Sequence, residues 1–166
     1  MKIHLCCGPN DMMPGWINVD AVNFGQEVTA DLGKPWLFAA DGKAEEIYCK
    51  DGFEHMESVE HFLRESARVL MVGGTLKIWV PHVKNPSSCR ITHKTYYTWN
   101  CFSVYPEPHD STQSLRVVSN RIYIGHKDSV LWKPVHALIN VFPKWWERVG
   151  YVSNIEVVFQ KVQGSS

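Results

Sequence analysis

The sequence has no net charge, because 17 lysine and arginine residues balance 17 aspartate and glutamate residues in a chain of 166 residues. No basic excess therefore supplies the broad electrostatic attraction that nonspecific nucleic-acid binding or an anionic membrane surface requires. The chain also lacks an apolar run near the roughly 20 residues of a membrane span, and its start lacks the basic-then-apolar order of a signal peptide. We expect a cytoplasmic protein that binds neither membranes nor nonspecific nucleic acid.

The five cysteines are odd in number and contain no Cys-x-x-Cys pair, a pattern that favours reduced thiols. Cys7 and Cys49 fall in or beside predicted buried strands. We expect both side chains to fill small apolar volumes rather than to react.

A metal site is not predicted from the histidines. Glu54-His55 and Glu60-His61 repeat a Glu-His pair six residues apart. In a helix this offset turns through about 600°, so the two rings do not share one face as ligands at i and i+4 would. Glu107-Pro108-His109-Asp110 is a further candidate cluster, which a solvated turn explains more simply.

The length fits one compact domain, which at this size buries roughly 70% of the surface of the unfolded chain. Short β-branched runs alternate with turns and a helical pattern, which is typical of a mostly parallel sheet covered by helices. We predict a single α/β domain with a mostly parallel sheet.

The most informative segment joins a glycine turn to an acidic strand end. A short strand over residues 2–5 leads to Gly8, and a second strand over residues 16–19 delivers Asp20, where a carboxylate can accept both hydroxyl protons of a ribose. The connection between them is too short for a full first helix. Only one glycine stands where a pyrophosphate requires G-x-G-x-x-G. The pattern favours a cofactor with one nucleoside and no phosphates, such as S-adenosylmethionine, and the competing interpretation is an ordinary strand-turn-strand.

Five motifs in order resemble a small class I S-adenosylmethionine-dependent methyltransferase of the methyltransferase-11-like type, which opens with "hLGCGPn...pGWiNvD". The matching segments are residues 5–20, the third strand over 27–32, a "kPwPF" loop over 34–38, the fourth strand with "hvLEH" over 45–55, and "RVLkPGGrL" over 62–76. Residues 92–99 resemble the family's "HKrfFTw" helix start beside the substrate opening.

The resemblance implies a Rossmann-like three-layer sandwich with an antiparallel edge strand, in which residues 1–82 form the cofactor half and residues 83–162 form a cap and complete the sheet. It also implies S-adenosyl-L-methionine as cofactor, with Asp20 on the ribose and Asp31 near the adenine amino group. The residues that would line the cofactor site are Leu5, Cys6, Cys7, Gly8, Asp20, Ala30, Asp31, Leu32 and Gly52.

The sequence departs from the family pattern at several positions. His4 replaces an acid or asparagine, Val72 replaces a proline, and Asp51 stands where relatives often carry histidine. Cys6 replaces the first glycine and places a side chain where the backbone is expected to approach the methionine half of the cofactor. A degenerate, non-catalytic cofactor-binding protein that acts as a sensor or partner subunit is therefore the alternative to an enzyme.

The remaining elements follow from local patterns. Ser58 is a plausible N-cap for a helix that runs to residue 71 and ends at Gly73-Gly74. The other predictions are a strand over 75–80, an irregular cap over 85–110, antiparallel strands over 115–124 and 155–159, a helix over 131–142 that Pro143 stops, and a loose tail over 164–166.

The predicted activity is methyl transfer by in-line displacement to a small or glycan-type acceptor, for which the protein mainly aligns the reactants. If the acceptor is a hydroxyl, a base helps remove its proton. Asp51, His93 and His82 are the catalytic candidates, because each follows a strand end or lies in the substrate motif. Trp145 and Trp146 cannot both face the interior, which suggests a homodimer contact.

Overall fold

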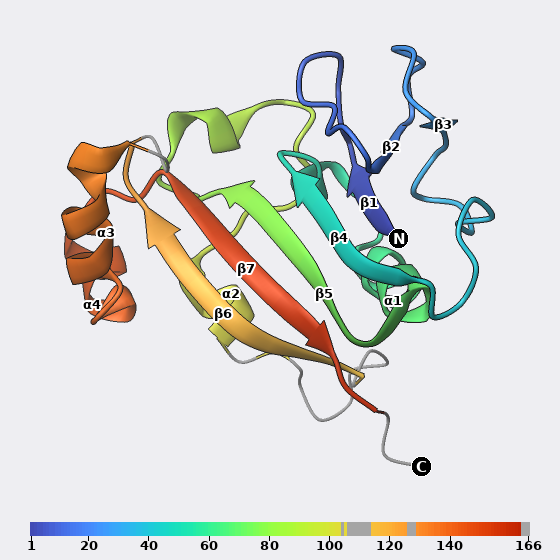
Figure 1. Ribbon diagram of the computed structural model, residues 1–166. Helices are drawn as coiled ribbons and strands as arrows, with labels where there is room; N and C mark the ends of the chain where they lie inside the picture. Colours follow the sequence, from blue (N-terminus) through green and yellow to red (C-terminus); the bar gives the residue numbers. More distant parts are fainter. Residues whose placement is uncertain (104, 106–113, 126–128, 164–166) are drawn as a thin grey trace.

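The computed structural model describes residues 1–103, 105, 114–125 and 129–163, and the strands within them form one seven-stranded sheet. The strand order is β3-β2-β1-β4-β5-β7-β6 (Figure 1). In chain order the strands are β1 (Lys2–Leu5), β2 (Ile17–Asp20), β3 (Val28–Thr29), β4 (Ala44–Lys50), β5 (Leu70–Pro81), β6 (Leu115–Tyr123) and β7 (Asn154–Lys161).

The sheet is parallel from β3 to β5, and β7 runs antiparallel to both of its neighbours, β5 and β6. The predicted α/β fold with a mostly parallel sheet and an antiparallel edge is confirmed. In open sheets of this kind, ligands bind outside the carboxyl ends of the parallel strands. A ligand site is therefore expected at the carboxyl ends of β1, β2 and β4.

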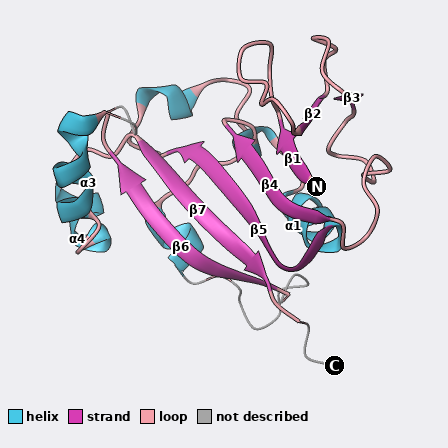
Figure 2. Cartoon of the chain, in the orientation of Figure 1, coloured by secondary structure: helices cyan, strands magenta, loops and turns pink. Residues whose placement is uncertain are grey.

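The helices are distributed unequally around the sheet. They are η1 (Phe53–His55), α1 (Val59–Val69), η2 (Pro86–Cys89), α2 (Trp99–Ser103), η3 (Val130–Trp132), α3 (Lys133–Ile139) and α4 (Pro143–Val149). In the view of Figure 2, α1 and α2 lie behind the sheet and α3 and α4 stand beside β6. The connection from β1 to β2 contains no helix, as its length predicted.

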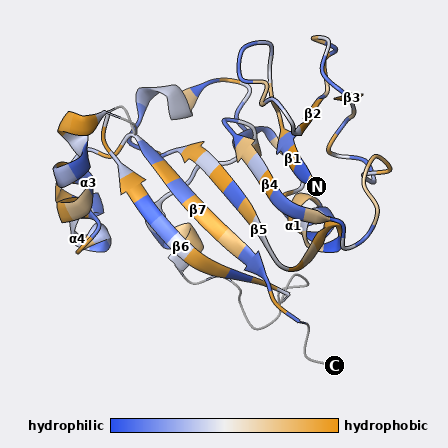
Figure 3. Ribbon diagram, viewed as in Figure 1, coloured by the Kyte–Doolittle hydropathy of each residue, from blue (hydrophilic) through white to orange (hydrophobic). Residues whose placement is uncertain are grey.

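Alternation along the strands places one face of the sheet in the core. In β7, the side chains of Ile155, Val157 and Phe159 are buried, and the ring of Phe159 meets that of Phe102 in α2 edge-on at a centroid distance of 6.2 Å. Polar and apolar bands alternate along β5 (Figure 3), because intervening residues such as Lys77 point to the opposite face. The helices α1 and α2 thus cover the apolar face.

Helix α1 begins where the sequence predicted. Ser58 has an extended backbone, and its hydroxyl oxygen accepts the N–H of His61 at 3.1 Å. Phe62 is fully buried, and its ring makes edge-on contacts with Trp36 and Phe53 at centroid distances of 5.4 and 5.1 Å. The cap and this aromatic contact fix the helix against the sheet.

The end of α1 differs from the prediction. The helix ends before Leu70, which pairs with Ala44 and opens β5, so Gly73-Gly74 lies inside a strand rather than at a helix stop. Gly73 has a φ of 84°, and a β-carbon on Gly74 would lie 2.9 Å from the carbonyl oxygen of Ala44. The two glycines allow an irregular stretch of β5 to pack closely against β4, which a local helix signal does not reveal.

Helix α2 begins at Trp99, the last residue of the segment that resembles a helix start. Two further predictions are corrected. The third strand, expected over residues 27–32, is limited to Val28–Thr29. The helix expected over residues 131–142 is divided into η3 and α3, and Pro143 starts α4 instead of only ending a helix. Proline suits the first helical position, because its missing N–H would have no intrahelical partner there.

Two predicted features, the Glu107-Pro108-His109-Asp110 cluster and the tail at residues 164–166, lie outside the described residues. In the part of the chain that the structure describes, no helix has both the length and the apolar character needed to cross a membrane. All five cysteines are free, and Cys7 and Cys49 are buried as expected.

Candidate functional site

The glycine turn and the acidic strand end meet at the carboxyl edge of the sheet. The N–H of Cys7 donates to the carbonyl of Val19 at 3.2 Å, which continues the pairing of β1 and β2. Gly8 has a φ of 54°, and its N–H donates to Oδ2 of Asp20 at 3.0 Å. The other carboxylate oxygen accepts the N–H of Val22 at 3.0 Å. Asp20 is therefore held in one orientation beside the turn, with lone pairs left for a ligand.

The segment after β3 comes to the same edge. Ala30 donates its N–H to the carbonyl of Asp20 at 2.9 Å, which joins the ends of β2 and β3. Asp31 is exposed, and its carboxylate accepts the N–H of Gly33 at 2.8 Å. Leu32 is buried. The structure thus brings Ala30 beside Asp20, and residues 31–32 follow it directly along the chain.

Cys6 and Gly52 meet where β1 and β4 end. Cys6 has a φ of 56°, so a non-glycine residue occupies the left-handed region at this turn. Its side chain lies over Gly52, where a β-carbon would be 2.5 Å from both Cβ and Sγ of Cys6. The hydrogen bond to Cys6 and burial together raise the pKa of the Cys49 thiol well above its usual value, so Cys49 stays protonated.

A second group of side chains surrounds a cavity of about 170 Å³ beyond the end of β4. The lining residues are Asp51, Glu54, His55, Pro81, Ser87, Arg90, His93 and Asn154. Asp51 has a φ of 49°, and its N–H donates to the carbonyl of Trp79 at 2.9 Å, which ties the turn to β5. Two of the three predicted catalytic residues, Asp51 and His93, therefore face one space.

Backbone hydrogen bonds bring His93 to η1. The N–H of Lys94 donates to the carbonyl of Glu54 at 2.8 Å, and the N–H of Thr95 donates to the same oxygen at 3.3 Å. Nδ1 of His55 donates to the carbonyl of Thr92 at 3.1 Å. Nε2 of His93 lies 4.0 Å from Oε1 of Glu54. Glu54 was not singled out as a functional residue by sequence, since its place in the "LEH" motif does not reveal that its carboxyl is buried.

Burial dominates the electrostatics of this cavity. It raises the pKa of Glu54 to about 7 and lowers the pKa of His93, because both charged forms lose hydration. Loss of water around Asp51 also raises its pKa, although part of this side chain stays exposed.

The third predicted catalytic residue, His82, is not brought together with the other two. Its Nδ1 accepts the N–H of Lys84 at 3.0 Å, so Nε2 carries the proton and donates to Glu147 of α4 at 2.8 Å. Its side chain has no exposed surface. His82 fastens the end of β5 to α4 in this structure.

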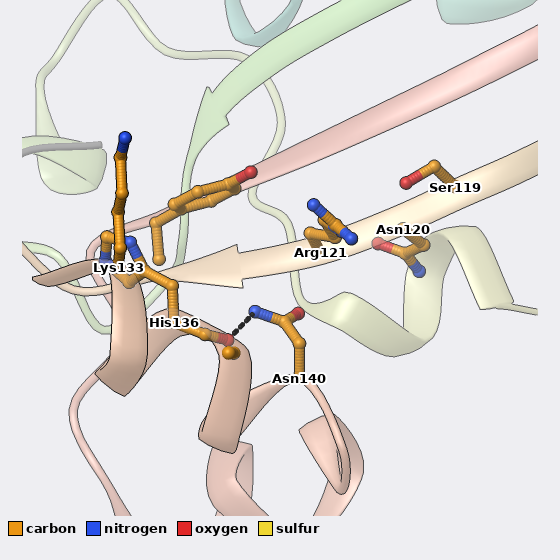
Figure 4. Close-up of a pocket in the computed structure, with 8 residues that line it drawn as sticks. Ser119, Asn120, Arg121, Lys133, His136 and Asn140 are labelled. Carbon is orange, nitrogen blue, oxygen red and sulfur yellow. Dashed lines mark hydrogen bonds between the residues drawn. The ribbon is translucent and has the colours of Figure 1, made fainter. Parts of the chain in front are cut away.

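A separate cavity of about 590 Å³ lies between β6 and α3 (Figure 4) and shares no lining residue with the cavity around Glu54. There Asn140 accepts the N–H of Ile122 and donates to the carbonyl of the same residue, each at 2.9 Å. His136 contacts the carbonyl of Ile124 at 2.9 Å. These side chains pair with backbone groups in β6 and directly after it, at the edge of the sheet.

No family model and no curated protein matches this sequence. Solved structures do match. A methyltransferase from Archaeoglobus fulgidus that depends on S-adenosylmethionine superposes with a TM-score of 0.66 at 14% identity, covering 96% of this chain and 85% of that one. The fold is that of the class I methyltransferases. A putative methyltransferase from Bacillus halodurans has a TM-score of 0.61 at 12% identity, with 98% and 92% of the two chains covered.

The class I methyltransferase fold also serves another reaction among these neighbours. The cyclase SpnF has a TM-score of 0.61 at 12% identity, with 98% of this chain and 74% of that chain covered. Identities this low establish the fold alone. Function has to be argued from the residues at the strand ends.

Proposed function

We propose that this protein binds S-adenosylmethionine and transfers its methyl group to a small or glycan-type acceptor. The observation that carries the proposal is the Gly8 turn bonded to Asp20 at the carboxyl edge of a sheet with this strand order. A carboxylate oriented in this way can accept the ribose hydroxyls of a nucleoside. The fold shared with methyltransferases supports the choice of cofactor.

The remaining cofactor contacts follow from position. Asp31 would meet the adenine amino group, with Ala30 and Leu32 beside the ring. The residues at the ends of β1 and β4 would hold the methionine half, and these are Leu5, Cys6, Cys7, Gly8 and Gly52. The sheet edge thus offers contacts for both halves of one extended ligand.

The cavity lined by Asp51, Glu54 and His93 would receive the acceptor, since it adjoins the end of β4. In-line methyl transfer needs the acceptor oxygen aligned with the sulfonium methyl and shielded from water. If the acceptor is a hydroxyl, Asp51 or His93 would take its proton. His82 would act as this base only if its hydrogen bond to Glu147 were broken.

A non-catalytic cofactor-binding protein is the second candidate, and the Cys6 side chain over Gly52 favours it. This side chain occupies the region expected for the methionine half. Calorimetric titration with S-adenosylhomocysteine tests cofactor binding, and transfer of label from S-adenosylmethionine to pooled sugars, nucleotides and metabolites tests catalysis. Cofactor binding without methyl transfer would favour the non-catalytic binding protein. Absence of cofactor binding would reject both the enzyme and the binding protein.

Exposed apolar side chains on α3, on α4 and in the turn between them support the expected homodimer. Leu138, Phe142 and Trp145 are 71%, 70% and 61% exposed, whereas Trp146 packs against the core. The neighbouring tryptophans do face different environments, as the sequence suggested. We propose that a second copy of the chain covers this surface.

A further inference from the structure

Three potential metal ligands converge beside the end of β4. One donor atom each from Glu54, His55 and His93 lies within 4.8 Å of the other two. A tetrahedral zinc ion bonded at about 2.0–2.2 Å holds its donors about 3.4 Å apart. The donors would need to approach by about 1.4 Å at most, a movement that side-chain rotation can supply.

Two of these side chains carry buried polar atoms that lack a partner within the described chain. Oε2 of Glu54 and Nδ1 of His93 make no hydrogen bond there, and the two residues are only 1% and 8% exposed. Leaving such groups unpaired costs free energy, which a bound cation would recover. The adjoining cavity of about 170 Å³ has room for an ion and its water.

His55 is already oriented as a ligand. The carbonyl of Thr92 can only accept a hydrogen bond, so the proton of His55 is on Nδ1 and the lone pair of Nε2 is available. Histidines that bind metals usually donate the other ring N–H to a carbonyl or carboxylate in this way. The rings of His55 and His93 lie edge to face with their centroids 4.7 Å apart.

The backbone holds the cluster together before any ligand binds. The carbonyl of Glu54 accepts the N–H groups of Lys94 and Thr95, which fixes the segment carrying His93 against η1. Arg90 also lines the cavity and opposes a cation, but the carboxylates of Asp51 and Glu54 offset its charge. The ammonium group of Lys94 pairs with Glu57 at 2.9 Å.

We propose that Glu54, His55 and His93 form a binding site for a first-row divalent cation of the Zn²⁺ class, bound through nitrogen and oxygen donors. Two imidazoles and one carboxylate suit such ions and leave a position open for water. The helical spacing argument against a metal does not apply, because Glu54-His55 lies in η1, outside α1. If the proposed methyl transfer holds, the open position would receive the acceptor oxygen and Asp51 would remain free as the base.

The test is titration of the chelator-treated, dialysed protein with Co²⁺, followed by visible absorption and then by competition with Zn²⁺. We expect one ion per chain and a spectrum without sulfur-to-cobalt charge transfer. Glu54→Gln and His93→Gln should each weaken binding at least tenfold. The double variant E60Q/H61Q removes the other Glu-His pair, on α1, and should bind as the wild type does.

Circular dichroism checks that each variant folds. If a variant does not fold, the Co²⁺-loaded wild type still tests the site, because shifted imidazole N–H signals are expected in its proton NMR spectrum. The proposed site would be overturned if the wild type bound no ion, or if its spectrum showed thiolate-to-cobalt bands. It would also be overturned if both folded single variants kept the wild-type affinity, or if only the control variant lost affinity. Separate titration with S-adenosylhomocysteine keeps this result distinct from the proposed function, because either kind of binding can fail alone.

Discussion

Cys6 and Gly52 occupy adjoining space so closely that only one of them can carry a side chain. A β-carbon on Gly52 would lie 2.5 Å from Cβ and Sγ of Cys6, which is far inside van der Waals contact. The turn after β1 can therefore hold a cysteine because the turn after β4 holds a glycine. This pairing explains how the turn after β1 accommodates the side chain of Cys6.

The pairing predicts a coupled effect on stability. Gly52→Ala should lower the free energy of unfolding by about 1–3 kcal/mol, the usual cost of overpacking. Adding Cys6→Gly should recover part of that loss, with a coupling of about 0.5–3 kcal/mol in a double-mutant cycle. Urea unfolding of the four proteins measures it. Additive losses would mean that the backbone shifts to separate the two residues.

Asp20→Ala should weaken S-adenosylhomocysteine binding by about 1.5–3 kcal/mol, the usual range for hydrogen bonds to a charged group. This corresponds to a loss of roughly 10- to 150-fold in affinity. Isothermal titration calorimetry measures it. Asp41→Ala is the control, because Asp41 pairs with Arg68 beside α1 instead of lying at the strand ends. Equal affinity in the Asp20 variant and the wild type would show that Asp20 does not bind the ribose.

The Cys6→Gly variant distinguishes between the two proposed functions, a methyltransferase and a non-catalytic cofactor-binding protein. We expect the wild type to transfer label from S-adenosylmethionine to an acceptor, and the variant to do the same at a comparable rate. Scintillation counting of separated products provides the measurement. If only the variant transfers label, the natural chain is a binder whose Cys6 side chain blocks the reacting geometry.

His4 should make the protein less stable in mild acid. Nδ1 of His4 contacts Oδ1 of Asn18 at 3.3 Å, and its buried Nε2 lacks a partner among the described residues. Burial lowers the pKa of His4 below its usual 6.5, so the folded state resists protonation. Its contribution is complete above about pH 6.5 and is lost as the pH falls from there through the folded pKa.

Urea unfolding between pH 7.5 and 5 tests this effect. His4→Gln should show a smaller loss of unfolding free energy over that interval than the wild type. His82, whose pKa burial also lowers, should leave a residual slope in both proteins. Identical slopes in the two proteins would assign the acid sensitivity to other groups.

Replacing exposed apolar residues should disrupt the proposed dimer. Phe142→Ser with Trp145→Ser removes two side chains that are 70% and 61% exposed, so the fold should persist. Light scattering after size exclusion should give twice the chain mass for the wild type and the single mass for the variant. A wild type that stays monomeric at high concentration would reject the interface.

Local sequence patterns correctly predict those elements that are stabilised by residues close to them in the sequence. The N-cap at Ser58 and the short strand before Gly8 depend on residues a few positions apart. The strand that delivers Asp20 was placed within one residue. The burial of Cys7 and Cys49 also followed from their places in or beside strands.

Only the tertiary structure decided features that depend on distant pairings. Leu70 leaves the helix pattern because it pairs with Ala44 in another strand. His82 turns away from the other candidates because Glu147, 65 residues later, accepts a hydrogen bond from its Nε2–H.

The sequence by itself determined the α/β fold and the glycine turn beside Asp20, since periodicity and turn chemistry act over a few residues. The approach of His93 to Glu54 depends on a backbone contact across 40 residues, between Lys94 and Glu54. No local pattern encodes which carboxyl becomes buried. The tertiary structure decided that cluster because burial and side-chain orientation depend on the packing of the whole chain.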